Sequence, residues 1–175
     1  MAKVKVNYMD DFRIAIADND IFIDNSLSAI IDTPFYVQIN NFCFPDCLWT
    51  DFSYPVICVW AENLLRNRGR INTHYTLPFM DGPYWIDVTQ NGNNLLLKGI
   101  NERKDKKIEF ISSCTVASVL HELLRALNKL ERIVLDNEEL IEREKRKAIL
   151  NSIHYYKMRI REDGDLPLCS DKTPK

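Results

Sequence analysis

Residues 84 to 98 read YWIDVTQNGNNLLLK, and this stretch decides the fold. Two runs that fit β-strands flank a polar segment. The pair Asn91-Gly92 inside that segment is the strongest short-range signal for a β-hairpin in the chain. Another strand-like run at 73–79 precedes the hairpin, and a second polar turn leads to one more at 107–111. The sequence therefore predicts an antiparallel meander of three or four strands.

The amino-terminal part also favours short strands. Large apolar residues stand at every second position of Phe12–Ile16, the period that a half-buried strand requires. Turn-forming residues at 18–20 then precede the apolar run Ile21–Ile23, which predicts a second hairpin. One more strand is expected at Phe35–Ile39, and a weaker strand signal covers Leu27–Ile31.

One helix is expected between these two groups of strands. Ser53 followed by Pro55 is a helix-start pattern, because proline in the first turn has no N–H to leave unsatisfied. From about Pro55 to Arg68 the apolar residues share one stripe, and Gly69 is placed to end the helix. The loop before it is rich in aromatic residues: Phe42, Phe44, Trp49, Phe52 and Tyr54. We interpret these rings as a corner of the core, or, where exposed, as anchors for a protein partner.

The carboxyl-terminal part has helical periodicity. A sustained apolar stripe over 116–134 predicts a long helix, with Ser112 or Ser113 as its cap. A last helix is expected from about Glu138 to Arg161. Taken together, the patterns predict an α+β fold: an antiparallel β-sheet with one inserted helix and C-terminal helices packed on the sheet.

Length and composition fit one globular domain. The chain has 175 residues, of which 46% are hydrophobic and 27% charged. We expect residues 1–163 to form a single α+β domain and residues 164–175 to form a flexible C-terminal tail.

A net charge of −2 excludes a domain that binds nucleic acid by overall positive charge. No apolar run approaches the roughly 18 residues of a membrane span, and the amino terminus does not fit a signal peptide. The expected location is the cytoplasm.

The five cysteines are odd in number and scattered along the chain. This pattern differs from the dense disulfide framework of small secreted proteins. Cys43 and Cys47 form the only close pair, and the other ligands that a zinc site needs at similar spacing are missing from the sequence. The sequence therefore predicts buried, reduced thiols and no metal site.

Sequence motifs for catalysis are also missing. The chain has no phosphate-binding glycine loop and no G-x-S-x-G nucleophile elbow. The stretch HELLR at 121–125 begins like a metalloprotease motif, but an arginine stands where the second zinc-binding histidine is required. We therefore expect no catalytic, cofactor or metal residues. An enzyme site built from scattered residues stays open as an alternative, for instance around His74 with Asp81 or Asp87.

Charge is distributed unevenly along the chain. Between residues 10 and 62 eight aspartates and Glu62 oppose a single cation, Arg13, whereas residues 102–161 carry fourteen Lys or Arg against ten Asp or Glu. One interpretation is that turns and strand ends favour aspartate. The other is an acidic face for a basic partner. The residues assigned to that partner-binding surface are Asp10, Asp11, Asp18, Asp20 and Asp24.

Four segments carry a resemblance to known proteins: Phe44-Pro45, WTDF at 49–52, the helical segment 59–65 and LPFMDGP at 77–83. Together they resemble a group of small bacterial cytoplasmic proteins. In outline the chain is similar to the immunity proteins of polymorphic toxin and contact-dependent growth inhibition systems. The resemblance implies a small, catalytically inert protein that neutralises a cognate toxin domain, and it transfers no catalytic residues.

The functional hypothesis is therefore a non-catalytic immunity protein whose acidic surface covers a basic, nuclease-type toxin. Opposite charges speed the encounter of two proteins, and buried aromatic contacts slow their dissociation. The expected partner is the toxin domain itself, with no direct contact to nucleic acid or membrane and no cofactor. A non-toxin binding or scaffold subunit of a bacterial complex is the main alternative, and an enzyme is the third.

Overall fold

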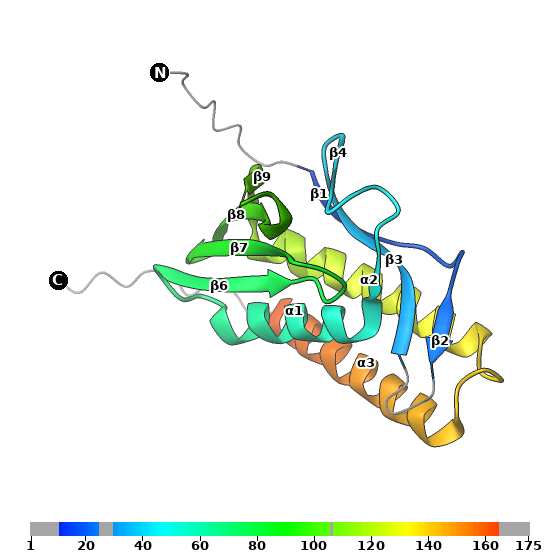
Figure 1. Ribbon diagram of the computed structural model, residues 1–175. Helices are drawn as coiled ribbons and strands as arrows, with labels where there is room; N and C mark the ends of the chain where they lie inside the picture. The colour runs from blue at the N-terminus through cyan, green and yellow to red at the C-terminus, as the bar shows by residue number, and fades with distance from the viewer. Residues whose placement is uncertain (1–10, 25–29, 106, 165–175) are drawn as a thin grey trace, which may run out of the picture.

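The computed structural model describes residues 11–24, 30–105 and 107–164 of the chain. The elements follow one another as Figure 1 shows: β1 (Phe12–Ile16), β2 (Phe22–Asp24), β3 (Ile30–Ile39), β4 (Phe42–Phe44), β5 (Thr50–Phe52), α1 (Ser53–Asn67), β6 (Thr73–Pro78), β7 (Tyr84–Asn91), β8 (Asn94–Asn101), a 3₁₀ turn (Glu102–Lys104), β9 (Lys107–Thr115), α2 (Val116–Asp136) and α3 (Arg143–Gly164). The predicted α+β class is confirmed, with the strands divided between two antiparallel sheets.

The predicted meander forms one of these sheets, in which β6, β7, β8 and β9 pair in chain order. Asn91 pairs with Asn94, so two residues make the turn between β7 and β8, and Gly92 takes a φ of +61° there. Glycine adopts this left-handed conformation without strain, which explains the strength of the hairpin signal. The pairing of β8 with β9 shifts register just after Gly99. A Cβ at Gly99 would lie 2.1 Å from the ring of Phe110, so only glycine lets that ring pack on the strand.

In the other sheet every strand pairs with β3. β1 pairs with the carboxyl-terminal half of β3, where Ile16 lies opposite Phe35. β2 pairs with its beginning, where Phe22 lies opposite Asp32. The predicted hairpin between β1 and β2 is therefore wrong, because the residues around Asp20 interrupt two pairings with the same strand instead of reversing the chain. Asp20 itself has a φ of 57°.

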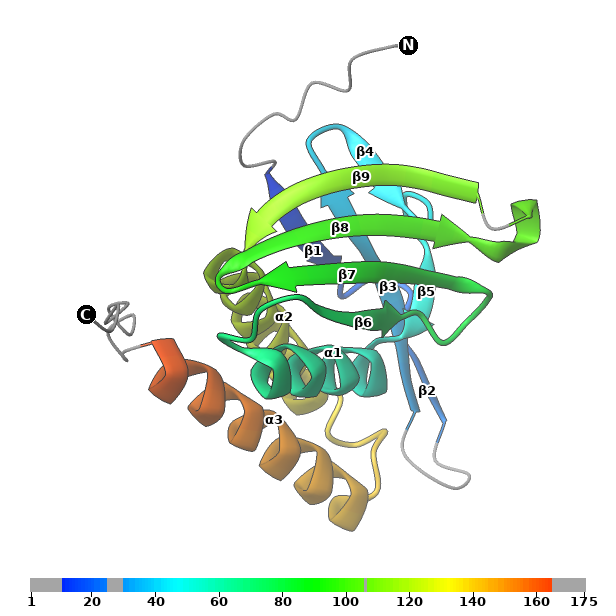
Figure 2. The same cartoon turned by 90° about the vertical axis from the view of Figure 1, so that its left-hand side faces the viewer.

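β3 begins at Ile30, so the weaker strand signal at Leu27–Ile31 is confirmed at its end, and residues 25–29 lie outside the described residues. β4 and β5 also pair with the two halves of β3. Figure 2 shows the meander in front, with the strands of the other sheet crossing behind it. The core lies between the sheets and helices α1 and α2, and Trp60, Phe35 and Phe44 are fully buried in it. Of the aromatic loop, Phe44 is buried in the core, Trp49 and Tyr54 pack against it, and Phe42 is exposed.

The helix starts differ from the predicted caps. α2 begins at Val116 and is capped by Thr115, which forms a reciprocal capping box with Ser118. The prediction of Ser112 or Ser113 is wrong because both residues belong to β9. The strand continues to the last residue before the helix, so the cap falls where the backbone changes conformation.

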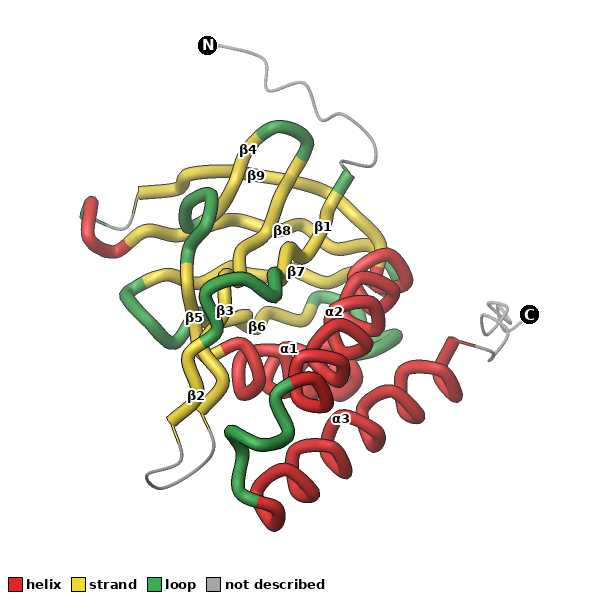
Figure 3. The backbone as a smooth tube through the Cα atoms, turned by 90° about the vertical axis from the view of Figure 1, so that its right-hand side faces the viewer, coloured by secondary structure: helices red, strands yellow, loops and turns green. Residues whose placement is uncertain are grey.

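α1 begins at Ser53, but this side chain does not cap it. The Ser53 hydroxyl donates instead to the carbonyl oxygen of Ile31, at 3.0 Å, and ties the helix to β3. α3 begins at Arg143 rather than near Glu138, because the acidic residues before it lie in a turn. Figure 3 shows α2 beside β1 and α3 along the outside of α1 and α2. α3 reaches Gly164, and residues 165–175 of the expected tail lie outside the described residues.

Two cysteines are not reduced as expected. Cys43 and Cys47 form a disulfide, with their Cα atoms 5.1 Å apart, a separation typical of disulfides. Cys114 and Cys58 form no disulfide, as expected; Cys114 is buried, whereas Cys58 is only partly buried. Burial raises the pKa of the Cys58 thiol to about 11, so it is protonated at neutral pH. Cys169 lies outside the described residues.

Among the helices of the described residues, none combines the length and apolar character of a membrane span.

Candidate functional site

Asp51 joins two of the segments that carry the resemblance. Its side chain is fully buried. The carboxylate accepts the indole N–H of Trp49 at 3.2 Å and the backbone N–H of Phe52 at 2.7 Å. It also accepts the backbone N–H groups of Met80 and Asp81, at 3.1 and 3.2 Å. One carboxylate therefore fastens the loop before α1 to the turn between β6 and β7.

Burial raises the pKa of Asp51, while the hydrogen bonds from Trp49 and the backbone act in the opposite direction. The turn that Asp51 holds is tightly packed. Trp49 meets the ring of Tyr84 edge-on at 5.0 Å. Gly82 has a φ of +132°, and a Cβ there would lie 3.1 Å from the Tyr84 ring. The residues that carry the resemblance in these two segments therefore form a structural junction.

The structure separates the aspartates that were assigned to a partner-binding surface. Asp11 lies before β1 and forms an ion pair with Arg13 at 3.0 Å. Asp18 follows β1 and pairs with Lys129 of α2. The hydrogen bond from Lys129 lowers the pKa of Asp18. Asp10 lies outside the described residues. The two ends of β1 thus carry carboxylates that are already matched by cations.

Asp20 and Asp24 lie at the two ends of β2, beside residues that sequence reasoning missed. Phe22, between them, is 63% exposed. Asp24 points to the same face as Phe22, because side chains two positions apart share a face of a strand. Asp32 lies directly opposite Phe22 on β3. We name the surface formed by Phe22, Asp24, Asp32 and the exposed Asp81 the acidic hairpin face.

Asp32 is held in an unfavourable environment. Desolvation by partial burial raises its pKa, and repulsion from Asp81 and Asp51 raises it further. One of its oxygens, Oδ1, is buried without a hydrogen-bond partner among the described residues. Within the same residues, no ion pair involves Asp20, Asp32 or Asp81. The negative charge of these three side chains is therefore poorly compensated inside the chain.

Replacing Asp32 by asparagine should stabilise the protein at neutral pH. The pKa of Asp32 is higher in the folded chain than its ordinary value of 3.8. The fold therefore binds the proton more tightly, and the free energy of unfolding falls as pH rises from 3.8 through the raised pKa. Thermal unfolding should give a higher Tm for Asp32→Asn than for the wild type at pH 7, with the difference shrinking as pH falls to about 4.

The matched control is Asp20→Asn, which removes an exposed carboxylate and keeps a residue type that tolerates a left-handed backbone. Its Tm should stay close to that of the wild type at both pH values. An Asp32→Asn variant that is less stable than the wild type at pH 7 would show that the carboxylate of Asp32 makes a favourable contact in the fold and is not destabilised by its surroundings.

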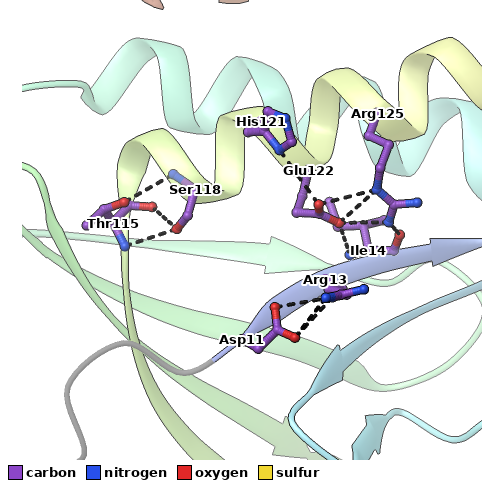
Figure 4. Close-up of polar contacts among 8 residues, drawn as sticks. All are labelled: Asp11, Arg13, Ile14, Thr115, Ser118, His121, Glu122 and Arg125. Carbon is purple, nitrogen blue, oxygen red and sulfur yellow. Dashed lines mark hydrogen bonds and ion pairs between the residues drawn. The ribbon is translucent and has the colours of Figure 1, made fainter.

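A second polar cluster joins α2 to β1 (Figure 4). Glu122 is almost fully buried, and its carboxylate accepts the backbone N–H of Ile14 at 3.0 Å. Arg125 forms an ion pair with Glu122 at 2.7 Å and donates to the carbonyl oxygen of Ile14. The exposed His121 lies 3.8 Å from Glu122. Together Glu122 and Arg125 satisfy both backbone groups of one residue on the edge of β1, which protects that edge from further pairing.

A hollow of about 430 Å³ lies beside this cluster. Its lining includes Arg13, Arg125, Tyr36 and Gln38. Both arginines already pair with carboxylates, Arg13 with Asp11 and Arg125 with Glu122. The hollow therefore offers little uncompensated charge to a ligand.

The residues of the enzyme alternative are brought together in part. His74 and Asp87 line one hollow of about 420 Å³ on the outer face of the meander, whereas Asp81 does not line it. His74 Nδ1 lies 3.1 Å from the hydroxyl of Thr89, and Asp87 accepts the indole N–H of Trp85 at 2.8 Å. The hydrogen-bond partner of each side chain is therefore a third residue. Among the residues that the structure describes, no group of three His, Cys, Asp or Glu side chains is placed to hold a metal ion.

The exposure of Asp32 could have been predicted from the alternation of residues along β3. Alternation along β3 buries Ile31, Thr33 and Phe35, so it turns Asp32 outward. The pairing of β2 with β3, which sets Phe22 beside Asp32, could not be predicted from neighbouring residues in the sequence.

Comparison with models of protein families, with curated proteins and with solved structures gives no match for this chain.

Proposed function

We propose that the chain is a non-catalytic immunity protein of a bacterial toxin system, which binds and neutralises a cognate toxin domain in the cytoplasm. The acidic hairpin face covers a basic surface of a nuclease-type toxin. The observation that carries this proposal is the exposed ring of Phe22, which is 63% accessible and lies directly opposite Asp32. A large aromatic side chain surrounded by charge is typical of a binding hot spot with a polar rim.

The unfavourable environment of Asp32 supports the same proposal. A carboxylate that lowers the stability of the free protein is expected where binding, rather than folding, needs the charge. A basic partner would neutralise Asp32 and Asp81 together. It would also desolvate Phe22, which adds hydrophobic free energy to the electrostatic attraction.

The test starts with capture of the partner from the source bacterium by the tagged chain, followed by mass spectrometry. We expect the carboxyl-terminal domain of a large secreted protein. That domain, expressed alone, should kill cells, and co-expression of this chain should protect them. Capture of a non-toxic partner would instead favour the scaffold alternative, and a captured domain that kills protected and unprotected cells alike would overturn the proposal.

Variants then locate the contact. Phe22→Ala should weaken binding about tenfold or more, chiefly by faster dissociation. A double variant that replaces Asp32 and Asp81 by asparagine should associate more slowly and with less dependence on salt. The matched control replaces Asp11 and Asp18 by asparagine, because both are already paired with cations. Equal effects of the two charge variants would remove the acidic hairpin face from the interface.

The Cys43–Cys47 disulfide makes the cytoplasmic location a separate point to test. Disulfides such as Cys43–Cys47 are more typical of oxidising compartments than of the cytoplasm. Fractionation of the source bacterium should recover the chain with cytoplasmic markers. Recovery from an oxidising compartment would mean that the protein meets its partner outside the cytoplasm.

A further inference from the structure

The outer face of the meander carries apolar side chains that the described part of the chain leaves uncovered. In Figure 2 this face is toward the viewer, and no helix crosses it. Ile108 and Ile111 of β9 are 48% and 52% exposed. The solvent face of an antiparallel sheet is normally polar, because only the opposite face packs on the core. Exposed isoleucines on such a face indicate a surface that meets a partner.

The strand registers arrange the outward side chains in rows across the sheet. One row runs from β6 to β9 through Thr76, Asp87 and Lys98 and ends at the apolar Ile111. Asp87 and Lys98 lie directly opposite each other on the two central strands. Lys98 makes no hydrogen bond or ion pair with the described residues. Opposite charges therefore stand side by side at the centre of this face without pairing.

A neighbouring row is apolar. Trp85 of β7 lies opposite Ile100 of β8, which lies opposite Ile108 of β9. Ile100 is only 6% exposed, so the surface of this row is supplied by the partly exposed Trp85 on one side and by Ile108 on the other. The outer face thus combines a charged pair with apolar side chains on both halves of the sheet.

These rows are self-complementary. Consider two sheets packed face to face about a two-fold axis that runs parallel to the strands, between β7 and β8. The axis sets β7 of one copy against β8 of the other, and β6 against β9. Asp87 of each copy then faces Lys98 of the other, and Trp85 lies over the row that ends at Ile108. A two-fold interface requires this kind of reciprocal match.

The shape of the face follows the same symmetry. The hollow of about 420 Å³ lies over β6 and β7, with Thr76 and Asp87 in its lining. Ile111 projects from β9, on the other half of the sheet. The two-fold axis places Ile111 of each copy over the β6 side of the other, where the hollow lies. An exposed apolar side chain and a recess to receive it thus occur at symmetry-related positions.

We propose that two copies of this chain associate through the outer faces of their β6–β9 sheets. The interface has apolar contacts from Trp85, Ile108 and Ile111, and two reciprocal ion pairs between Asp87 and Lys98. Sheets that pack face to face lie about 10 Å apart. The proposal uses other residues than the acidic hairpin face and does not depend on the proposed function.

Sedimentation of the full chain over about 1–100 μM tests the association. The wild type should form a dimer. Ile111→Glu, Asp87→Lys and Lys98→Asp should each raise the dissociation constant of the dimer by about tenfold or more, through a buried charge or a like-charge contact. The double variant Asp87→Lys/Lys98→Asp should dimerise like the wild type within about threefold, because it restores the reciprocal pairs in reversed order.

Leu135→Glu is the matched control, since Leu135 is 51% exposed on α2 and its replacement should leave the dimer intact. Circular dichroism and Tm values of all variants establish that they fold. A wild type that stays monomeric at every concentration overturns the proposal, as does a dimer that survives Ile111→Glu. If the wild type is monomeric and Ile111→Glu instead abolishes capture of another protein, the face binds that protein and not a second copy.

Discussion

Replacing Asp51 by alanine should lower the free energy of unfolding by roughly 3 kcal/mol or more. The carboxylate is fully buried and accepts hydrogen bonds from the Trp49 indole and from three backbone N–H groups: those of Phe52, Met80 and Asp81. Alanine removes every acceptor at once and leaves these donors unsatisfied. For a chain of this length, such a loss corresponds to a fall in Tm of about 10 °C.

Asparagine at the same position separates hydrogen bonding from charge. With its side-chain oxygen in the place of Oδ1, Asp51→Asn keeps an acceptor for the three backbone N–H groups, whereas its NH₂ group replaces Oδ2 and cannot accept from the Trp49 indole or from Met80. Burial raises the pKa of Asp51, so the fold favours the neutral form of this side chain more than water does. We therefore expect a loss of only about 1 kcal/mol for Asp51→Asn.

Urea unfolding followed by tryptophan fluorescence measures both variants. Asp46→Ala is the control, because Asp46 is an exposed aspartate of the same loop with a single bond from the Cys47 N–H. Its unfolding free energy should stay within about 1 kcal/mol of the wild type. If Asp51→Ala is as mild as Asp46→Ala, the junction does not hold the two segments together.

Replacing Glu122 by alanine should cost about 3 kcal/mol of unfolding free energy. The change leaves the Ile14 N–H without an acceptor and Arg125 without its carboxylate. Glu122→Gln should be milder, since its amide oxygen still accepts from Ile14 while the ion pair is lost. Arg125→Ala should also be milder, because the Arg125 side chain is 50% exposed and water can take its place.

Amide hydrogen exchange gives a local readout of the same prediction. The Ile14 N–H should exchange much faster in Glu122→Ala than in Glu122→Gln, after allowance for global stability. Glu144→Ala, at an exposed glutamate of α3, is the control and should leave the exchange of Ile14 unchanged. Equal protection of Ile14 in the wild type and in Glu122→Ala would mean that α2 does not cap the edge of β1.

Local patterns predicted the meander and the helices well. The Asn91-Gly92 signal and the apolar runs beside it specify β7 and β8, because hairpin pairing is set by a few neighbouring residues. The stripe over 116–134 likewise matches α2, apart from its cap. Such signals depend on spacings of two to four positions along the chain, so a single sequence contains them in full.

The candidate binding surfaces could not be predicted from such local patterns. The sequence alone determined the α+β class, the hairpin at Gly92 and an excess of acid near the amino terminus. Only the tertiary structure decided which aspartates are matched by cations, which one is buried and which one faces Phe22. Asp51 binds a backbone 29 positions away, and Glu122 binds one 108 positions away. The free energy of a carboxylate depends on the donors, charges and water around it, and those neighbours come together only when the chain folds.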